Sequence, residues 1–302
     1  MSIDWKRVAK PQPDAYDTYV ISQELHKTNG WVKTKPVDCR FTLCDGHVAV
    51  VPDPIHTDEG LVRGGMCNAT DRWTDQDAAN IDPYLRTWTD GYEMLKLFLD
   101  EFWPKWSLTM LNHAGSRGCS SGHYDLKHGS IRRPYVNAVY VTINSHQGCA
   151  EGIYHEVGHI RLNALNLRIE EHDGRLITNT PDELYISPIR RDKKRPMSAV
   201  IQAIYSWLIF GENDLQVAVL PDNALVSAEY LIGNLPKIED GLVTIREHVK
   251  CTAEGTKFMD GYFEWGDDLV TRARAHCQEQ FGAEYDTRYA MACKYRDVIV
   301  PD

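Results

Sequence analysis

The stretch IYHEVGHIRLNAL, residues 153–165, contains the motif from which the fold and the function of this chain can be predicted. It places His155, Glu156 and His159 in an HExxH pattern, and its apolar residues recur at helical spacing. Four residues turn a helix by about 400°, so both imidazoles leave one face and can reach one metal ion. Glu156 lies about 100° around the helix from His155, where it can hydrogen-bond to a metal-bound water. We therefore predict a metal-binding helix.

The residues on either side of this motif predict the local fold. Residues 138–143 (AVYVTI) form a β-prone run, the polar turn NSHQG follows, and a helical pattern extends over residues 149–171. A strand, a turn and a metal-binding helix in this order are the arrangement by which zincin-type sites place an edge strand beside the metal. We expect an α+β, helix-dominated fold with a zincin-like core of strand plus HExxH helix and a helical C-terminal half.

The pattern of the remaining chain predicts further elements. Residues 47–52 (HVAVVP) indicate a strand in a region, up to about residue 65, that we expect to hold loops and short strands. Residues 84–103 repeat apolar residues at helical intervals, and Pro104 follows. Another helix is predicted over residues 196–210, and three more between residues 224 and 281.

No linker interrupts the chain, so we predict a single α+β domain over residues 1–302. Its N-terminal part, residues 1–135, is rich in loops and strands and has one long helix, whereas residues 136–302 hold the metal-site strand and the helices. A split into two domains near residue 135 is the alternative.

The composition excludes several classes of protein. The 302 residues are 43% hydrophobic and 25% charged, which is typical of a globular protein and not of a disordered or fibrous one. The net charge of −10 argues against nucleic acid as a partner, because phosphate binding needs a basic surface.

No targeting or membrane-spanning segment is predicted. The N-terminal residues are polar, and the longest apolar-rich stretch, residues 198–210, is shorter than the ~20 residues that span a bilayer. The eight cysteines include no CxxC pair, so we expect reduced thiols and no zinc ribbon. We therefore expect a cytoplasmic protein with no membrane partner.

Two histidines hold a catalytic metal poorly, so a third donor is needed. The residues after His159 lack the glycine and third histidine of metzincins, and the predicted helix at 196–210 lacks the glutamate of gluzincins. Gln202 is the polar residue that this helix directs inward. The rival donors are more distant in sequence and comprise Glu183, His123 and Asp125.

Several stretches carry a resemblance to a known family. They are SRGCSSGHYD (116–125), NAVYVTI (137–143), HEVGHIRLNAL (155–165), LYISPIRRDKKRPMSAVIQAIYSWLIF (184–210) and CTAEGTKFMDGY (251–262). Together they resemble the HExxH-type proteins encoded beside ribosomally made peptide natural products, which are regarded as iron(II)- and 2-oxoglutarate-dependent peptide β-hydroxylases. The resemblance extends over about half of the chain. Ile189 departs from it, because the family often has tryptophan there, and the basic loop is one residue longer.

The resemblance implies roles for particular residues. His155 and His159 would hold iron(II), and Gln202 falls where the family often has a histidine, which makes it the implied third ligand. The distal carboxylate of 2-oxoglutarate needs a fixed cation, for which bidentate arginine is the best partner. Three arginines of the loop between the two helices are the candidates, namely Arg190, Arg195 and Arg191. A solvated basic loop, or a dock for an acidic leader peptide, is the alternative.

Three functions remain open from the sequence. The first is an oxygenase that hydroxylates Cβ of a residue in a ribosomally synthesised precursor peptide, with Glu156 positioning the substrate or a ligand water. The second is a zinc metallopeptidase, in which Glu156 is the general base. The third is a degenerate peptide-binding protein without activity, a reading that the weak ligand Gln202 favours.

Overall fold

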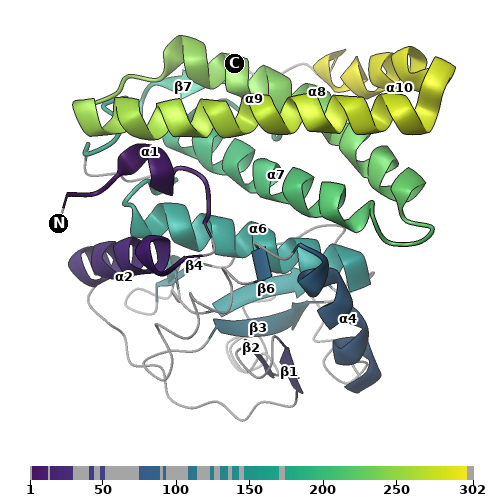
Figure 1. The fold of residues 1–302 in the computed structure, drawn as a ribbon. Coiled ribbons are helices and arrows are strands. Elements are labelled where there is room, and N and C mark those ends of the chain that lie inside the picture. The colour runs from purple at the N-terminus through teal and green to yellow at the C-terminus, as the bar shows by residue number, and fades with distance from the viewer. Residues whose placement is uncertain are drawn as a thin grey trace. The chain divides into compact units, whose positions relative to one another are not determined.

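The computed structural model describes residues 2–12, 14–29, 41–43, 48–51, 75–88, 91–92, 108–113, 123–125, 130–134, 138–142, 146–169 and 174–297. The chain divides into two compact units (Figure 1). Pro13–Arg161 forms one, here named the sheet unit, and Met1–Gln12 with Leu162–Asp302 forms the other, the bundle unit. The single-domain organisation stays a prediction. None of the described helices has an apolar stretch long enough to cross a membrane.

The sheet unit contains a four-stranded sheet in the order β1-β2-β3-β6. β1 (Phe41–Leu43) is antiparallel to β2 (Val48–Val51), whereas β2, β3 (Leu108–His113) and β6 (Ala138–Thr142) are parallel. β2 and β6 are rich in β-branched residues and confirm the two strands that the sequence predicts. β6 is last in this order, and it immediately precedes the helix with the HExxH motif.

A second, two-stranded sheet and three helices complete the described part of the sheet unit. β4 (His123–Asp125) pairs antiparallel with β5 (Ser130–Pro134), with an irregular register between its ends. The helices are α2 (Ala15–Asn29), α4 (Asp75–Thr87) and α6 (His146–Ala164), whose residues from Leu162 on belong to the bundle unit. α6 confirms the helix predicted at residues 149–171, but it begins three residues earlier and ends at Ala164.

The helix α2 was not predicted, since residues up to about 65 were expected to hold loops and short strands. Among the α2 residues whose side chains the structure describes, the buried ones are Asp17, Val20, Ile21 and Glu24, which recur at helical spacing. Two of these four residues are acidic, so the apolar stripe that usually reveals an amphipathic helix is interrupted. The expectation for this segment was therefore wrong because carboxylates occupy part of the buried face.

The helix predicted at residues 84–103 overlaps α4 only at residues 84–87, which are the last four residues of α4. α4 begins at Asp75, contains Pro83 in its interior and ends at Thr87. Residues 91–92 are again helical, and residues 93–103 lie outside the described residues. The predicted start was wrong because the N-terminal half of α4 is mostly polar and carries no apolar period.

The bundle unit is built on three long helices, which Figure 1 shows in teal, green and yellow-green. They are α7 (Met197–Val217), α8 (Ala224–His248) and α9 (Ala253–Phe281), with α7 against α8 and α8 against α9. α7 confirms the helix predicted at residues 196–210 and extends it by two turns. The three helices predicted between residues 224 and 281 are wrong, because two long helices occupy this range.

Glycines explain this error. A Cβ on Gly241 of α8 would lie 2.1 Å from Cδ1 of Ile204, and one on Gly266 of α9 would lie 2.8 Å from Cδ2 of Leu242. These glycines therefore permit close helix packing and do not end the helices. Their role depends on neighbours from other helices, which the local sequence does not reveal.

Shorter elements border the bundle. α1 (Trp5–Val8) packs on α9, where a Cβ on Gly261 would lie 2.1 Å from the carbonyl oxygen of Lys6. β7 (Leu184–Tyr185) pairs antiparallel with β8 (Arg195–Pro196). The C-terminal elements are the 3-10 turn η3 (Gly282–Glu284), α10 (Tyr285–Ala292) and the 3-10 turn η4 (Cys293–Asp297).

Candidate metal centre

The two motif histidines lie one turn apart on α6 and direct the same ring atom towards each other. The Nε2 atoms of His155 and His159 are 3.1 Å apart, and the ring planes are nearly perpendicular. Two imidazoles that bind one ion with bonds of ~2.0–2.2 Å, at octahedral or tetrahedral angles, have nitrogens about 2.8–3.6 Å apart. The observed separation therefore fits two ligands of a single metal ion.

Burial and the nearby His159 set the protonation state of His155. The side chain of His155 is 16% exposed, and His159 is buried. Burial, and second the nearby His159, hold the pKa of His155 well below its usual value. His155 is therefore neutral at physiological pH, and the neutral imidazole is the form that ligates metal.

Glu156 adds a buried carboxylate next to the histidine pair. Its Oε1 lies 3.9 Å from Nε2 of His155, and the residue is only 2% exposed. This places the carboxylate close to the ring atom that would face a metal. A group in this position can accept a proton or a hydrogen bond from a water or substrate on the same metal.

Contacts on both sides of the motif fix α6. Before it, the hydroxyl of Tyr154 donates to the carbonyl oxygen of Leu85 at 2.6 Å, and its ring packs edge-on against Trp88. After it, the guanidinium of Arg161 makes a bidentate ion pair with the carboxylate of Asp17, and both side chains are buried. The histidines therefore stand on a helix anchored to α4 and to α2, as a preorganised site requires.

Gln202, the implied third ligand, is buried in the bundle unit with a fixed orientation. Its Nε2 donates to Oδ1 of Asn163 at 3.1 Å and to the carbonyl oxygen of Leu167 at 2.6 Å. Both amide hydrogens are thus engaged, so only Oε1 could ligate a metal. The histidine pair belongs to the sheet unit, and a ligand role for Gln202 stays a prediction.

The alternative candidates for the third metal ligand lie on other elements than α6 and α7. His123 and Asp125 lie at the two ends of β4, and their side chains are outside the described residues. Glu183 lies in the bundle unit and is ion-paired with Lys250. Within the described ranges, no group of three or more His, Cys, Asp or Glu side chains forms a metal-binding cluster.

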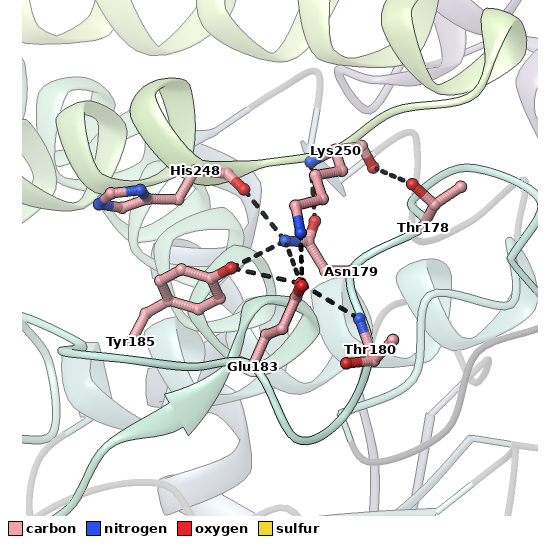
Figure 2. A network of polar contacts seen from close by, with 7 residues as sticks. All are labelled: Thr178, Asn179, Thr180, Glu183, Tyr185, His248 and Lys250. Atoms are coloured by element: carbon pink, nitrogen blue, oxygen red, sulfur yellow. Dashed lines mark hydrogen bonds and ion pairs between the residues drawn. The ribbon is translucent and has the colours of Figure 1, made fainter.

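Glu183 belongs to a polar network centred on the buried Asn179 (Figure 2). Nδ2 of Asn179 donates to Oε2 of Glu183, to the hydroxyl of Tyr185 and to the carbonyl oxygen of His248, at 3.0–3.2 Å. Its Oδ1 accepts the backbone N–H of Lys250 at 2.8 Å. The ion pair and hydrogen bonds lower the pKa of Glu183, led by its bond to Lys250. This network joins the β7 segment to the α8–α9 connection.

The three loop arginines have different surroundings, all within the bundle unit. Arg190 is exposed and makes a bidentate pair with Asp192, with Nη2 to Oδ2 at 2.7 Å. Arg191 lies over the ring of Tyr295, and its Nη2 donates to the carbonyl oxygen of Arg296. Arg195 is half-buried in β8. Their binding to 2-oxoglutarate stays a prediction.

Two residues that hold the site helix and the polar network in place, Asp17 and Asn179, were not predicted from the sequence. Asp17 lies 144 residues from Arg161, and Asn179 lies 71 residues from Lys250, so no local pattern links them. Comparison with known proteins adds no assignment, since no protein-family model and no curated protein matches this chain.

Proposed function

We propose that α6 carries a divalent metal ion and that the protein is an enzyme acting through it. The observation that carries this proposal is the 3.1 Å separation of the Nε2 atoms of His155 and His159. Two further observations support it. The depressed pKa of His155 favours the neutral ligand form, and Glu156 lies beside the same ring atom.

We propose iron(II) as the metal, with 2-oxoglutarate as cosubstrate, in agreement with the sequence resemblance. Together with O₂, these groups supply the oxidising power to hydroxylate an aliphatic carbon. Two histidines and a third donor leave open positions for such a cosubstrate. Gln202 is the proposed third donor through Oε1, and the loop arginines are proposed to hold the distal carboxylate of 2-oxoglutarate.

The proposed substrate is a ribosomally made precursor peptide, hydroxylated at Cβ of one residue. β6 is the last strand in the described order of the sheet and leads directly into α6. An extended peptide can add to such an edge through backbone hydrogen bonds. Glu156 would then orient the bound peptide or a ligand water through its carboxylate.

A zinc peptidase is the second candidate, and the position of Glu156 favours it. A carboxylate 3.9 Å from the nitrogen of His155 is placed to take a proton from a metal-bound water. Glu156→Gln separates the two functions. A peptidase loses nearly all turnover without its general base, whereas an oxygenase keeps measurable turnover because its carboxylate only orients.

The metal proposal is tested by equilibrium dialysis of the whole protein against iron(II), under anaerobic conditions, and against zinc. His155→Ala and His159→Ala should each abolish stoichiometric metal binding while the circular dichroism spectrum is preserved. His146→Ala, on the same helix but outside the motif, is the matched control and should bind as the parent does. Parental stoichiometry in either motif variant contradicts the proposed metal centre.

The cosubstrate is tested by titrating 2-oxoglutarate into the anaerobic iron(II) protein and following the metal-to-ligand charge-transfer absorption. Arg190→Ala or Arg195→Ala should weaken 2-oxoglutarate about ten- to a hundredfold, because a charged bidentate partner is lost. Iron affinity should stay unchanged, since arginine does not ligate metals. If no loop arginine alters the apparent dissociation constant, this loop does not hold the cosubstrate.

A further inference from the structure

The β7–β8 hairpin, residues 184–196, carries the three arginines that are proposed to bind the cosubstrate. β7 and β8 are each two residues long, with Leu184 opposite Pro196 and Tyr185 opposite Arg195. A two-stranded hairpin is at best marginally stable by itself, and strands of two residues are shorter than usual. The position of the arginines therefore depends on contacts outside the hairpin.

Asn179 connects the base of this hairpin to the α8–α9 connection (Figure 2). Its Nδ2 donates to the hydroxyl of Tyr185 and to the carbonyl oxygen of His248, both at 3.0 Å, and its Oδ1 accepts the backbone N–H of Lys250 at 2.8 Å. The ring of Tyr185 also stacks on that of His248, with the ring centres 5.2 Å apart. Because Asn179 is buried, water competes little for its hydrogen bonds. Tyr185 is thus fixed at its hydroxyl and at its ring.

The fixed tyrosine bears directly on one of the three arginines. Tyr185 and Arg195 are opposite each other, and the Cα atoms of such antiparallel partners lie about 4.5–5.5 Å apart. A shift of Tyr185 is therefore passed to the backbone of Arg195. On its other side, Arg195 precedes Pro196, the N-cap residue of α7. Arg195 is thus held between the start of a long helix and an anchored strand.

The other two arginines are held by different contacts. Arg190 pairs with the carboxylate of Asp192, and Arg191 donates to the carbonyl oxygen of Arg296. Neither of these contacts involves the network around Asn179. Arg195 is therefore the arginine whose position follows most directly from that network.

We propose that Asn179 and Tyr185 are positioning residues that orient Arg195 for the distal carboxylate of 2-oxoglutarate. They do not contact the cosubstrate; they hold β7, and β7 holds Arg195 in β8. A guanidinium fixed in advance binds a carboxylate more tightly, because less conformational freedom is lost on binding. This inference rests on the proposed cosubstrate, and it assigns the distal carboxylate to one arginine of the hairpin.

The test is a double-mutant cycle on the binding of 2-oxoglutarate to the anaerobic iron(II) protein, followed by the charge-transfer absorption. Tyr185→Phe should weaken binding about threefold and Asn179→Ala about tenfold, because hydrogen bonds that hold β7 are lost. In an Arg195→Ala background, neither substitution should weaken binding further, since both act through this arginine. Iron affinity should stay unchanged in all variants, because the proposed metal ligands lie outside the hairpin.

Tyr289→Phe is the matched control. The hydroxyl of Tyr289 donates to Glu239, and its ring stacks on that of Tyr285, with the ring centres 5.9 Å apart. The substitution therefore removes the same kind of contact from the same unit, but away from the hairpin. Tyr289→Phe should bind 2-oxoglutarate as the parent does. A loss as large as that of Tyr185→Phe would indicate general destabilisation and overturn the positioning role.

The remaining outcomes separate this inference from the proposed function. Weakened binding in Arg195→Ala, with parental affinity in Asn179→Ala and Tyr185→Phe, contradicts the positioning role but not the cosubstrate. Additive losses in the double variants would show that the two residues do not act through Arg195. Absence of 2-oxoglutarate binding by the iron-loaded parent contradicts the proposed function, and this inference with it. Thermal midpoints above the temperature of the titration confirm that the variants are folded.

Discussion

The histidine pair of α6 and the carboxylate of Glu212 on α7 are both buried and titratable, but they are compensated in different ways. Glu212 accepts a hydrogen bond from Nε1 of Trp265 at 2.8 Å and two from the guanidinium of Arg272 at 3.0 and 2.7 Å. Its charge is matched by a cation and an indole N–H. On α6, in contrast, His155 and His159 bring two bases of the same kind to within 3.1 Å.

This difference separates structural polar groups from candidate ligands. A group with complementary partners stabilises the fold as it stands, and removing a partner strands a buried charge. The neighbouring His159 disfavours protonation of His155, and a metal ion between the two rings would be bound by both nitrogens. The same helix shows both cases, because Arg161 and Asp17 form a complementary pair two residues beyond the motif.

The largest expected effect comes from breaking the complementary pair. Asp17→Ala leaves the guanidinium of Arg161 buried without its carboxylate, which should cost about 3–5 kcal/mol of unfolding free energy in urea denaturation. Asp82→Ala is the control, since its ion pair with Arg86 is partly exposed and should contribute less than about 1 kcal/mol. Equal losses in the two variants would contradict the distinction.

The next effect concerns the histidine pair and requires metal. At free metal a hundred times the dissociation constant, the parent protein should gain about 2.7 kcal/mol of stability by linkage. His159→Ala should lose this gain entirely, and its metal-free stability should stay close to that of the parent. The measurement is thermal unfolding with and without metal, with His146→Ala as control. Metal-dependent stabilisation that survives in His159→Ala places the ion elsewhere.

A smaller effect tests the network of Figure 2. Asn179→Ala removes the four hydrogen bonds of a buried amide, including the one accepted from the part-buried N–H of Lys250, which should cost about 2 kcal/mol in urea unfolding. Lys250→Met removes only the exposed ion pair with Glu183 and should cost clearly less. The reverse order would mean that the ion pair and not the buried amide holds the network together.

The smallest effect is a pH dependence in the metal-free protein. The folded-state pKa of His155 lies below its unfolded value, so the unfolded chain binds more protons as pH falls below ~6.5. The parent should therefore lose stability relative to His155→Gln between pH 7 and 5, by at most about 1.4 kcal/mol per pH unit. Parallel stability curves for the two proteins would contradict the depressed pKa.

Local patterns predicted the elements whose structure is decided locally. β2 and β6 follow from β-branched runs, and α6 and α7 follow from helical periodicity. α2 escaped prediction because Asp17 and Glu24 share its buried face, and a carboxylate there is tolerable only when a partner arrives from elsewhere. The lengths of α8 and α9 escaped it because their glycines serve helix packing.

The candidate site also combines features that the local sequence determines with features that only tertiary contacts determine. The spacing of His155 and His159 by itself determined that the two rings share one helix face, because backbone hydrogen bonds fix the geometry from one turn to the next. The tertiary structure alone decided that Asp17 anchors Arg161 and that Asn179 joins two segments. It also decided that Tyr185 stacks on His248. These contacts join residues tens of positions apart, and packing of the whole unit, not the order of neighbouring residues, selects such partners.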